Sequence, residues 1–190
     1  TLSSSSAASD VYKRQLRDRT LFIADTHVNP QPTAEQIAEM AKLAADEVQH
    51  FGIEPKIALL SHSNFGSSSR ECAQKMARAR QLIKDQWPDL IVEGEMQADA
   101  ALNPSILEGV FPHAELPEAA NVLIVPNVDA GNIAFNLLRQ FTEGGEYIGP
   151  IMLGMQHPVH ILSISAPVRR IVNMTALAVV EAQERAGKKK

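Results

Sequence analysis

Residues 61–69, with the sequence SHSNFGSSS, contain the densest group of potential anion-binding side chains in the chain. The segment follows the apolar run 57–60 and precedes a helical pattern, so it forms a strand-to-helix turn. Hydroxyl groups and free amides at a helix start favour an anion, and a glycine lets the backbone approach it closely. The alternative is an ordinary polar loop with a serine cap, since no Walker motif is present. The candidate ligand-binding residues are Ser61, Ser63, Gly66 and Ser67.

A second polar turn, Asp129-Ala130-Gly131-Asn132, follows the clearest apolar run, residues 121–125. Asp129 can cap the following helix, Gly131 permits a close backbone approach, and Asn132 can orient an amide or a phosphate. We include Asp129, Gly131 and Asn132 among the candidate ligand-binding residues. Helix capping and packing explain the same pattern equally well.

Three clustered carboxylates, Glu93, Glu95 and Asp99, could hold Mg²⁺ or share acid–base chemistry. No histidine stands at a convincing ligand spacing from them, and Pro158 prevents the regular helix that His157 and His160 need to share a metal. We therefore favour a structural role, in which the carboxylates cap neighbouring loops, and assign no metal site.

The candidate residues lie between alternating strand and helix patterns from residue 21 onward. This alternation predicts an α/β fold, a mostly parallel sheet with helices on both faces. Ligands of such sheets bind where strands end, which directs attention to loops 25–32, 61–69, 93–99, 126–132 and 154–166. The expected strands are 21–24, 57–60, 90–92, 121–125 and 148–153, and the expected helices begin near residues 33, 71, 97, 130 and 167.

Composition excludes several classes of function. The chain has 190 residues, 45% of them hydrophobic, which suffices for one domain with a buried core. A net charge of −4 and 5% aromatic residues argue against nucleic-acid binding. No apolar run approaches the roughly 20 residues of a membrane span. A single cysteine, Cys72, precludes an intrachain disulfide and fits a cytoplasmic location.

The two ends differ from the rest in composition. Residues 1–15 are rich in serine and alanine and aperiodic, so we expect a foreign or disordered leader outside the fold. Residues 187–190 form a basic tail. The domain is therefore expected to span residues 16–186.

Taken in order, the motifs resemble the phosphate acetyl/butyryltransferase family. The matching stretches are FIADTHVNPQPTAEQIAE, IALLSHSNFGSSS, VEGEMQADAAL, NVLIVPNVDAGNIAFNLL and YIGPIMLGMQHPVHILS. The resemblance implies an isocitrate/isopropylmalate dehydrogenase-like fold, of which this chain is the C-terminal portion of a two-subdomain unit. It also implies an acyl-CoA and phosphate site in the cleft between the subdomains.

One segment departs from the family pattern. Active members carry a serine followed by an arginine that binds phosphate, and an aspartate seven residues after the serine that assists deprotonation of the CoA thiol. Ser163 matches the serine, but Ile164 replaces the arginine and Arg170 replaces the aspartate. Isoleucine cannot bind phosphate and arginine cannot accept a proton near neutral pH, so we expect catalysis to be impaired.

This altered segment, with HVNPQPT and SHSNFGS, looks most like the C-terminal domain of bacterial NADP-dependent malic enzymes. That resemblance implies a regulatory domain that binds acetyl-CoA or a related acyl-CoA and controls malate oxidation by preceding domains, which hold the NADP and divalent metal. It also implies that the protein is a homo-oligomer. No cofactor is expected in this chain itself. The alternatives are an active phosphate acetyl- or butyryltransferase and a purely structural oligomerisation domain.

Overall fold

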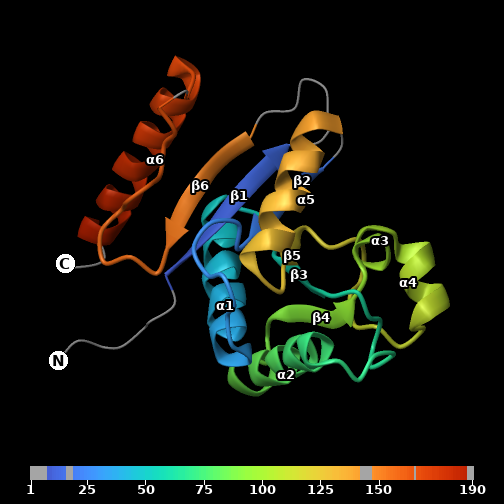
Figure 1. Cartoon of the computed structure of the whole chain (residues 1–190). Coiled ribbons are helices and arrows are strands. Elements are labelled where there is room, and N and C mark those ends of the chain that lie inside the picture. Colours follow the sequence, from blue (N-terminus) through green and yellow to red (C-terminus); the bar gives the residue numbers. More distant parts are fainter. Residues whose placement is uncertain (1–7, 16–18, 142–146, 165, 188–190) are drawn as a thin grey trace.

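The computed structural model describes residues 8–15, 19–141, 147–164 and 166–187. Its centre is a six-stranded sheet in the order β4-β3-β5-β2-β1-β6 (Figure 1). The strands are β1 (Ser9–Gln15), β2 (Thr20–Ala24), β3 (Lys56–Leu60), β4 (Ile91–Met96), β5 (Val122–Ile124) and β6 (Tyr147–Leu153). The helices are α1 (Ala34–His50), α2 (Glu71–Gln86), α3 (Ala98–Leu102), α4 (Pro104–Val110), α5 (Val128–Phe141) and α6 (Val168–Gly187).

The sheet is mixed, with one reversed strand. β4, β3, β5 and β2 pair in parallel, whereas β1 is antiparallel to both β2 and β6. β6 therefore runs in the same direction as the parallel strands. The α/β class is confirmed, and the predicted mostly parallel sheet needs this correction at β1.

Strand β1 also corrects the expectation that residues 1–15 lie outside the fold. Ser9–Gln15 pairs with strands on both sides, and the Ser9, Asp10 and Val11 side chains are buried. Backbone pairing needs no apolar periodicity, and donors from the turn after β2 satisfy Asp10, so composition did not indicate a strand here. Residues 1–7 of the expected leader and 188–190 of the expected tail lie outside the described residues.

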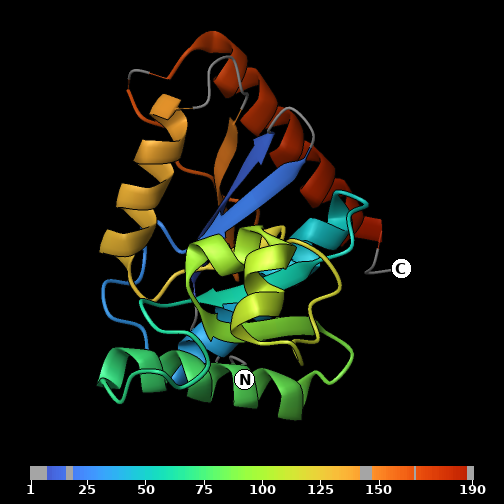
Figure 2. The same ribbon diagram turned by 90° about the vertical axis from the view of Figure 1, so that its right-hand side faces the viewer.

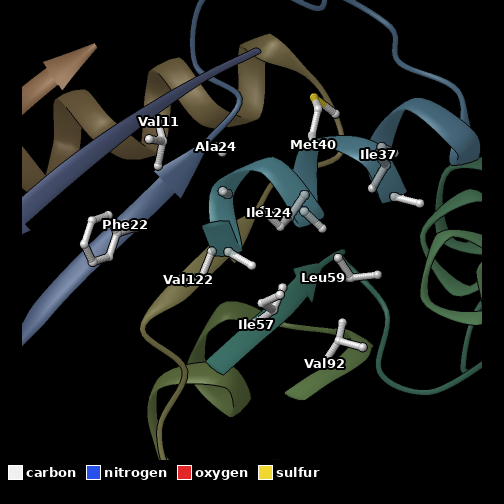
Figure 3. Close-up of a cluster of buried hydrophobic side chains, with 14 of the residues drawn as sticks. Val11, Phe22, Ala24, Ile37, Met40, Ile57, Leu59, Val92, Val122 and Ile124 are labelled. Carbon is white, nitrogen blue, oxygen red and sulfur yellow. The ribbon is translucent and has the colours of Figure 1, made fainter. Parts of the chain in front are cut away.

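Alternating side chains of the central strands separate two apolar cores. On one face Phe22, Ala24, Ile57 and Leu59 pack against α1 and α2 (Figure 3). On the other face Leu21, Ile23 and Ala58 pack against α3 and α4. Figure 2 shows α5 and α6 on opposite sides of the strands. Both faces are covered because successive strand residues point in opposite directions.

Local signals account for several element boundaries. The Thr33 hydroxyl accepts from the Gln36 amide, and the Gln36 side chain accepts from the Thr33 amide, which completes the expected capping box of α1. Gly52, at φ +71°, follows the end of that helix. β4 is longer than expected, so Glu93 and Glu95 lie within a strand. None of the described helices combines the length and apolar character that a bilayer crossing requires.

Helix α5 approaches the end of β2 closely at Gly131. A Cβ atom at this position would lie 2.2 Å from the Asp25 carbonyl oxygen and 2.9 Å from a Val125 methyl group. A side chain here must displace either the helix or the strand end. Gly131 is therefore required for packing, which the sequence left as one of two explanations.

Substitution of Gly131 by alanine should destabilise the fold by about 1–3 kcal/mol through overpacking. The matched control is Gly109→Ala in α4, where an added Cβ meets no atom within 4 Å. There the higher helix propensity of alanine should be neutral or stabilising by up to about 1 kcal/mol. Urea unfolding midpoints measure both, and equal midpoints for Gly131→Ala and the unmodified chain contradict the packing argument.

Helix α6 carries a buried carboxyl group, Glu181, whose Oε1 lies 3.4 Å from Nε2 of His160. Burial, with a smaller contribution from Glu47, raises the pKa of Glu181 to about 7. Because the pKa is raised on folding, the folded state keeps this proton when the unfolded chain has lost it. The contribution of Glu181 to stability therefore falls as the pH rises from about 4.5 to 7.

Replacing Glu181 by glutamine should remove this pH dependence. Relative to the unmodified chain, Glu181→Gln should gain about 1–2 kcal/mol of unfolding free energy between pH 5 and pH 8. Urea unfolding at both pH values tests this, with the exposed Glu108→Gln on α4 as control. Parallel pH profiles for Glu181→Gln and the unmodified chain refute the assignment.

Candidate functional site

Two adjoining cavities lie where β2 and β5 end. The first, of about 350 Å³, is lined by residues of β1, α5, α6 and the loops after β2 and β6, including Ser163. The second, of about 290 Å³, is lined by the turn after β2 and the start of α5, including Asp129. His27 and Asn132 line both. The expectation that ligands bind at strand ends thus agrees with the location of these cavities.

The first cavity has a cationic wall. Arg170 donates through Nε and a terminal nitrogen to the Gly149 carbonyl oxygen, at 3.0 and 2.5 Å. Its guanidinium also lies 5.1 Å from the centre of the Tyr147 ring, and that of Arg139 lies 5.2 Å from the same ring. None of the described residues that line this cavity is an aspartate or a glutamate. The arrangement favours an anionic ligand.

The turn after β2 holds His27 at the boundary of the cavities. The buried Asp10 carboxylate accepts from the amides of Thr26 and His27 at 2.8 and 3.0 Å, and from the Thr26 hydroxyl at 2.6 Å. Nδ1 of His27 lies 2.8 Å from that hydroxyl and 3.4 Å from Asp10 Oδ2. The hydrogen bond with Asp10 raises the pKa of His27, although burial opposes the rise.

Asp25, at the end of β2, shapes the same turn. Oδ1 accepts from the amides of His27 and Val28, and Oδ2 accepts from the amide of Asn29, all within 2.9 Å. Burial, together with Asp10, raises the pKa of Asp25 to about 6. Burial alone would raise the pKa of Asp10 as well, but hydrogen bonds from His27, Asp25 and Thr26 hold it at about 2. The two carboxyl groups therefore take up their protons at different pH.

The sequence did not single out His27 or Asp10 as site residues. His27 has no second histidine or cysteine at a metal-ligand spacing to mark it, and Asp10 lies in the segment expected to be a leader. The available signals were the polar sequence Asp25-Thr26-His27 directly after an apolar strand and its place in the expected ligand-binding loop 25–32.

The serine-rich loop does not reach these cavities. Oε1 of the buried Glu95 accepts from the Ser63 hydroxyl and the Gly66 amide, both at 2.8 Å. The Ser67 hydroxyl lies 3.0 Å from that of Ser63, and the Ser61 hydroxyl accepts from the Ser63 amide. Two donors proposed for an external phosphate, the Ser63 hydroxyl and the Gly66 amide, thus bind a carboxylate of the protein itself.

The other two clustered carboxylates also have internal partners. Glu93 pairs with Arg80 at 2.6 Å and accepts from the Glu115 amide at 2.9 Å, and Asp99 accepts from the Ala100 amide at 2.8 Å. These contacts agree with the structural interpretation of the acidic cluster. In the described part of the chain, no group of three or more His, Cys, Asp or Glu side chains is arranged to hold a metal ion.

Residues 1–179 match the sequence profile of the family described as Phosphate acetyl/butaryl transferase. The chain belongs to this family. The resemblance inferred from the motifs is therefore confirmed.

Relatives within the phosphate acetyl/butyryltransferase family fall into two groups. The chain is 54% identical over 162 residues to an NADP-dependent malic enzyme from Salmonella typhimurium, which covers 85% of the chain and 21% of the relative. It is 36% identical to a phosphate acetyltransferase from Corynebacterium glutamicum, covering 96% of the chain and 55% of that protein. The chain thus spans about a fifth of the malic enzymes and half of the shorter transferases that it matches.

Solved family members have the same fold. A phosphotransacetylase from Streptococcus pyogenes superposes with a TM-score of 0.89 at 30% identity, covering 94% of this chain and 55% of that one.

The segment that departs from the family pattern lies at the first cavity. Ser163 and Arg170 both line it, whereas the Ile164 side chain is fully exposed. Arg170, in place of the family's aspartate, adds a positive charge to the wall. The structure thus brings Asn132 and Ser163 to one cavity and Asp129 to its neighbour, while Ser61, Ser63, Gly66 and Ser67 lie in the separate loop around Glu95.

If Glu95 organises that loop, Glu95→Ala should leave the Ser63 hydroxyl and the Gly66 amide without their acceptor. The expected cost is about 2–4 kcal/mol, with faster hydrogen exchange at the Gly66 amide. Glu95→Gln keeps a carbonyl oxygen and should preserve most of the protection. Unchanged exchange in the alanine variant contradicts this role.

Proposed function

We propose that this chain is an acyl-CoA-binding regulatory domain in a longer protein of the NADP-dependent malic enzyme type. In this proposal acetyl-CoA binds at the two cavities and alters the rate of malate oxidation by other domains. The observation that carries it is Arg170, which replaces an acidic proton acceptor beside Ser163 with a guanidinium held by Gly149. The first cavity, whose described lining has cations and no carboxylate, suits binding of an anion better than deprotonation of a thiol.

Two further observations support regulation over transfer. Ile164 points to solvent, at the position where active members present a phosphate-binding arginine to the ligand. The malic enzyme from Salmonella typhimurium matches at 54% identity, against 36% for the phosphate acetyltransferase from Corynebacterium glutamicum. For a ligand to regulate, it must bind two conformations of the whole protein with different affinity.

The proposal predicts that acetyl-CoA binds the full-length protein and changes its malate oxidation rate. Arg139→Ala should weaken binding roughly tenfold, the scale of one charge-assisted contact. Arg78→Ala is the control, because Arg78 is an exposed arginine of α2 that pairs with Glu35. Calorimetric titration measures the affinity for acetyl-CoA, and steady-state kinetics measure the change in the malate oxidation rate. No effect of saturating acetyl-CoA on malate oxidation rules out regulation, and assembly without any acyl-CoA binding favours the structural alternative.

An active transferase is the second candidate, and one observation favours it. His27 lines the cavity that contains Ser163 and is paired with Asp10, so it can accept a proton. In this case the full-length protein should form acetyl phosphate from acetyl-CoA and phosphate, and His27→Gln should reduce that rate. Absence of acetyl phosphate formation removes this candidate.

A further inference from the structure

His27 occupies the boundary between the two cavities with only one edge of its ring engaged. Nδ1 faces Thr26 Oγ1 and Asp10 Oδ2, and the imidazole is 35% exposed. Nε2 lies on the opposite edge, and within the described part of the chain no hydrogen bond reaches it. Because the ring lines both cavities, this edge is the part available to a ligand.

The hydrogen bonds around Thr26 assign the ring protons. The Thr26 hydroxyl donates its only hydrogen to Asp10 Oδ2, so its oxygen accepts from His27, and Nδ1 carries a hydrogen. In the neutral ring Nε2 is then a bare acceptor, which repels phosphate oxygens. Protonation turns Nε2 into a charged donor. His27 can therefore bind a phosphate group only as imidazolium.

The charged and titratable groups around His27 come from every element that packs on it. They are Asp10 and Tyr12 of β1, Asp25 at the end of β2, Asp129 and Arg139 of α5, and Arg170 of α6. Asp10 and Asp25 favour the imidazolium, whereas Arg170 opposes it. The cations of the first cavity add attraction for an anion, whereas the Asp129 carboxylate in the first turn of α5 opposes an anion in the second cavity.

We propose that His27 is a positioning residue that binds a phosphate group of the acyl-CoA ligand only when protonated, so that binding takes up a proton. This inference rests on the proposed function. It adds a proton-linked phosphate contact outside the Ser163 segment, and it makes the affinity for the ligand fall as the pH rises.

The direction of this dependence follows from the pKa shifts. The bond with Asp10 raises the pKa of free His27, and a bound phosphate raises it further. The affinity should therefore be greatest below the pKa of free His27 and decline through neutral pH. Asp25, whose pKa is about 6, titrates in the same range, so variants are needed to assign the effect.

Calorimetric titration of the full-length protein with acetyl-CoA from pH 6 to pH 8, in buffers of different ionisation enthalpy, measures affinity and proton uptake together. The unmodified protein should bind roughly tenfold more weakly at pH 8 than at pH 6. His27→Gln should bind about tenfold more weakly at pH 6 and lose the uptake. His27→Lys should bind tightly at both pH values, because its charge persists. The control is the exposed His113→Gln, which should match the unmodified protein.

The outcomes separate this inference from the proposed function. Binding with the same affinity and proton uptake in His27→Gln overturns the inference and leaves the proposed function standing. No binding by the unmodified protein overturns both. Titration with inorganic phosphate identifies the source of the phosphate group. If free phosphate binds with proton uptake and His27→Gln abolishes this binding, the subsite is one for free phosphate. If only acetyl-CoA binds, the group is a phosphate of the coenzyme.

Discussion

The hydrogen bonding of Asp25 is the constraint on which the site depends. Its carboxylate accepts from three consecutive amides after β2 and turns the chain sharply at the sheet edge. This turn sets the position of Thr26 and His27. The backbone carbonyl of Asp25 packs against Gly131, where α5 comes closest to the end of β2. Asp25 thus fixes how the start of α5 is placed against the end of β2, and both cavities lie along this junction.

The positive charge on the wall of the first cavity depends on a different feature, the packing of α6 against β6. Arg170 reaches across to the Gly149 carbonyl and the Tyr147 ring, so β6 and α6 together determine where its guanidinium lies. A carboxylate at this position can accept a proton, whereas a guanidinium can only attract and donate. The residue type at position 170 therefore decides whether this part of the wall can accept a proton or only attract and donate to an anion.

The serine-rich loop shows how an anion-binding pattern can be satisfied internally. The Ser63 hydroxyl and the Gly66 amide donate to the Glu95 carboxylate of β4, and hydrogen bonds between Asn64 and Gln97 join the same two segments. Burying a carboxylate is unfavourable unless several donors surround it, and this loop supplies them. The same donors cannot serve an external phosphate at the same time.

The sequence by itself determined the family, the α/β class and most helices, because the capping box at Thr33, the apolar strand runs and five ordered motifs are local signals. It also selected Asn132 and Ser163 as candidate ligand-binding residues, and both line the first cavity. Only the tertiary structure decided that Glu95 occupies the serine-rich loop, that β1 is part of the sheet, and that His27 lies between the cavities. These depend on contacts between residues far apart in the chain, such as Ser63 with Glu95 and Asp10 with Thr26, and no local pattern encodes such partners.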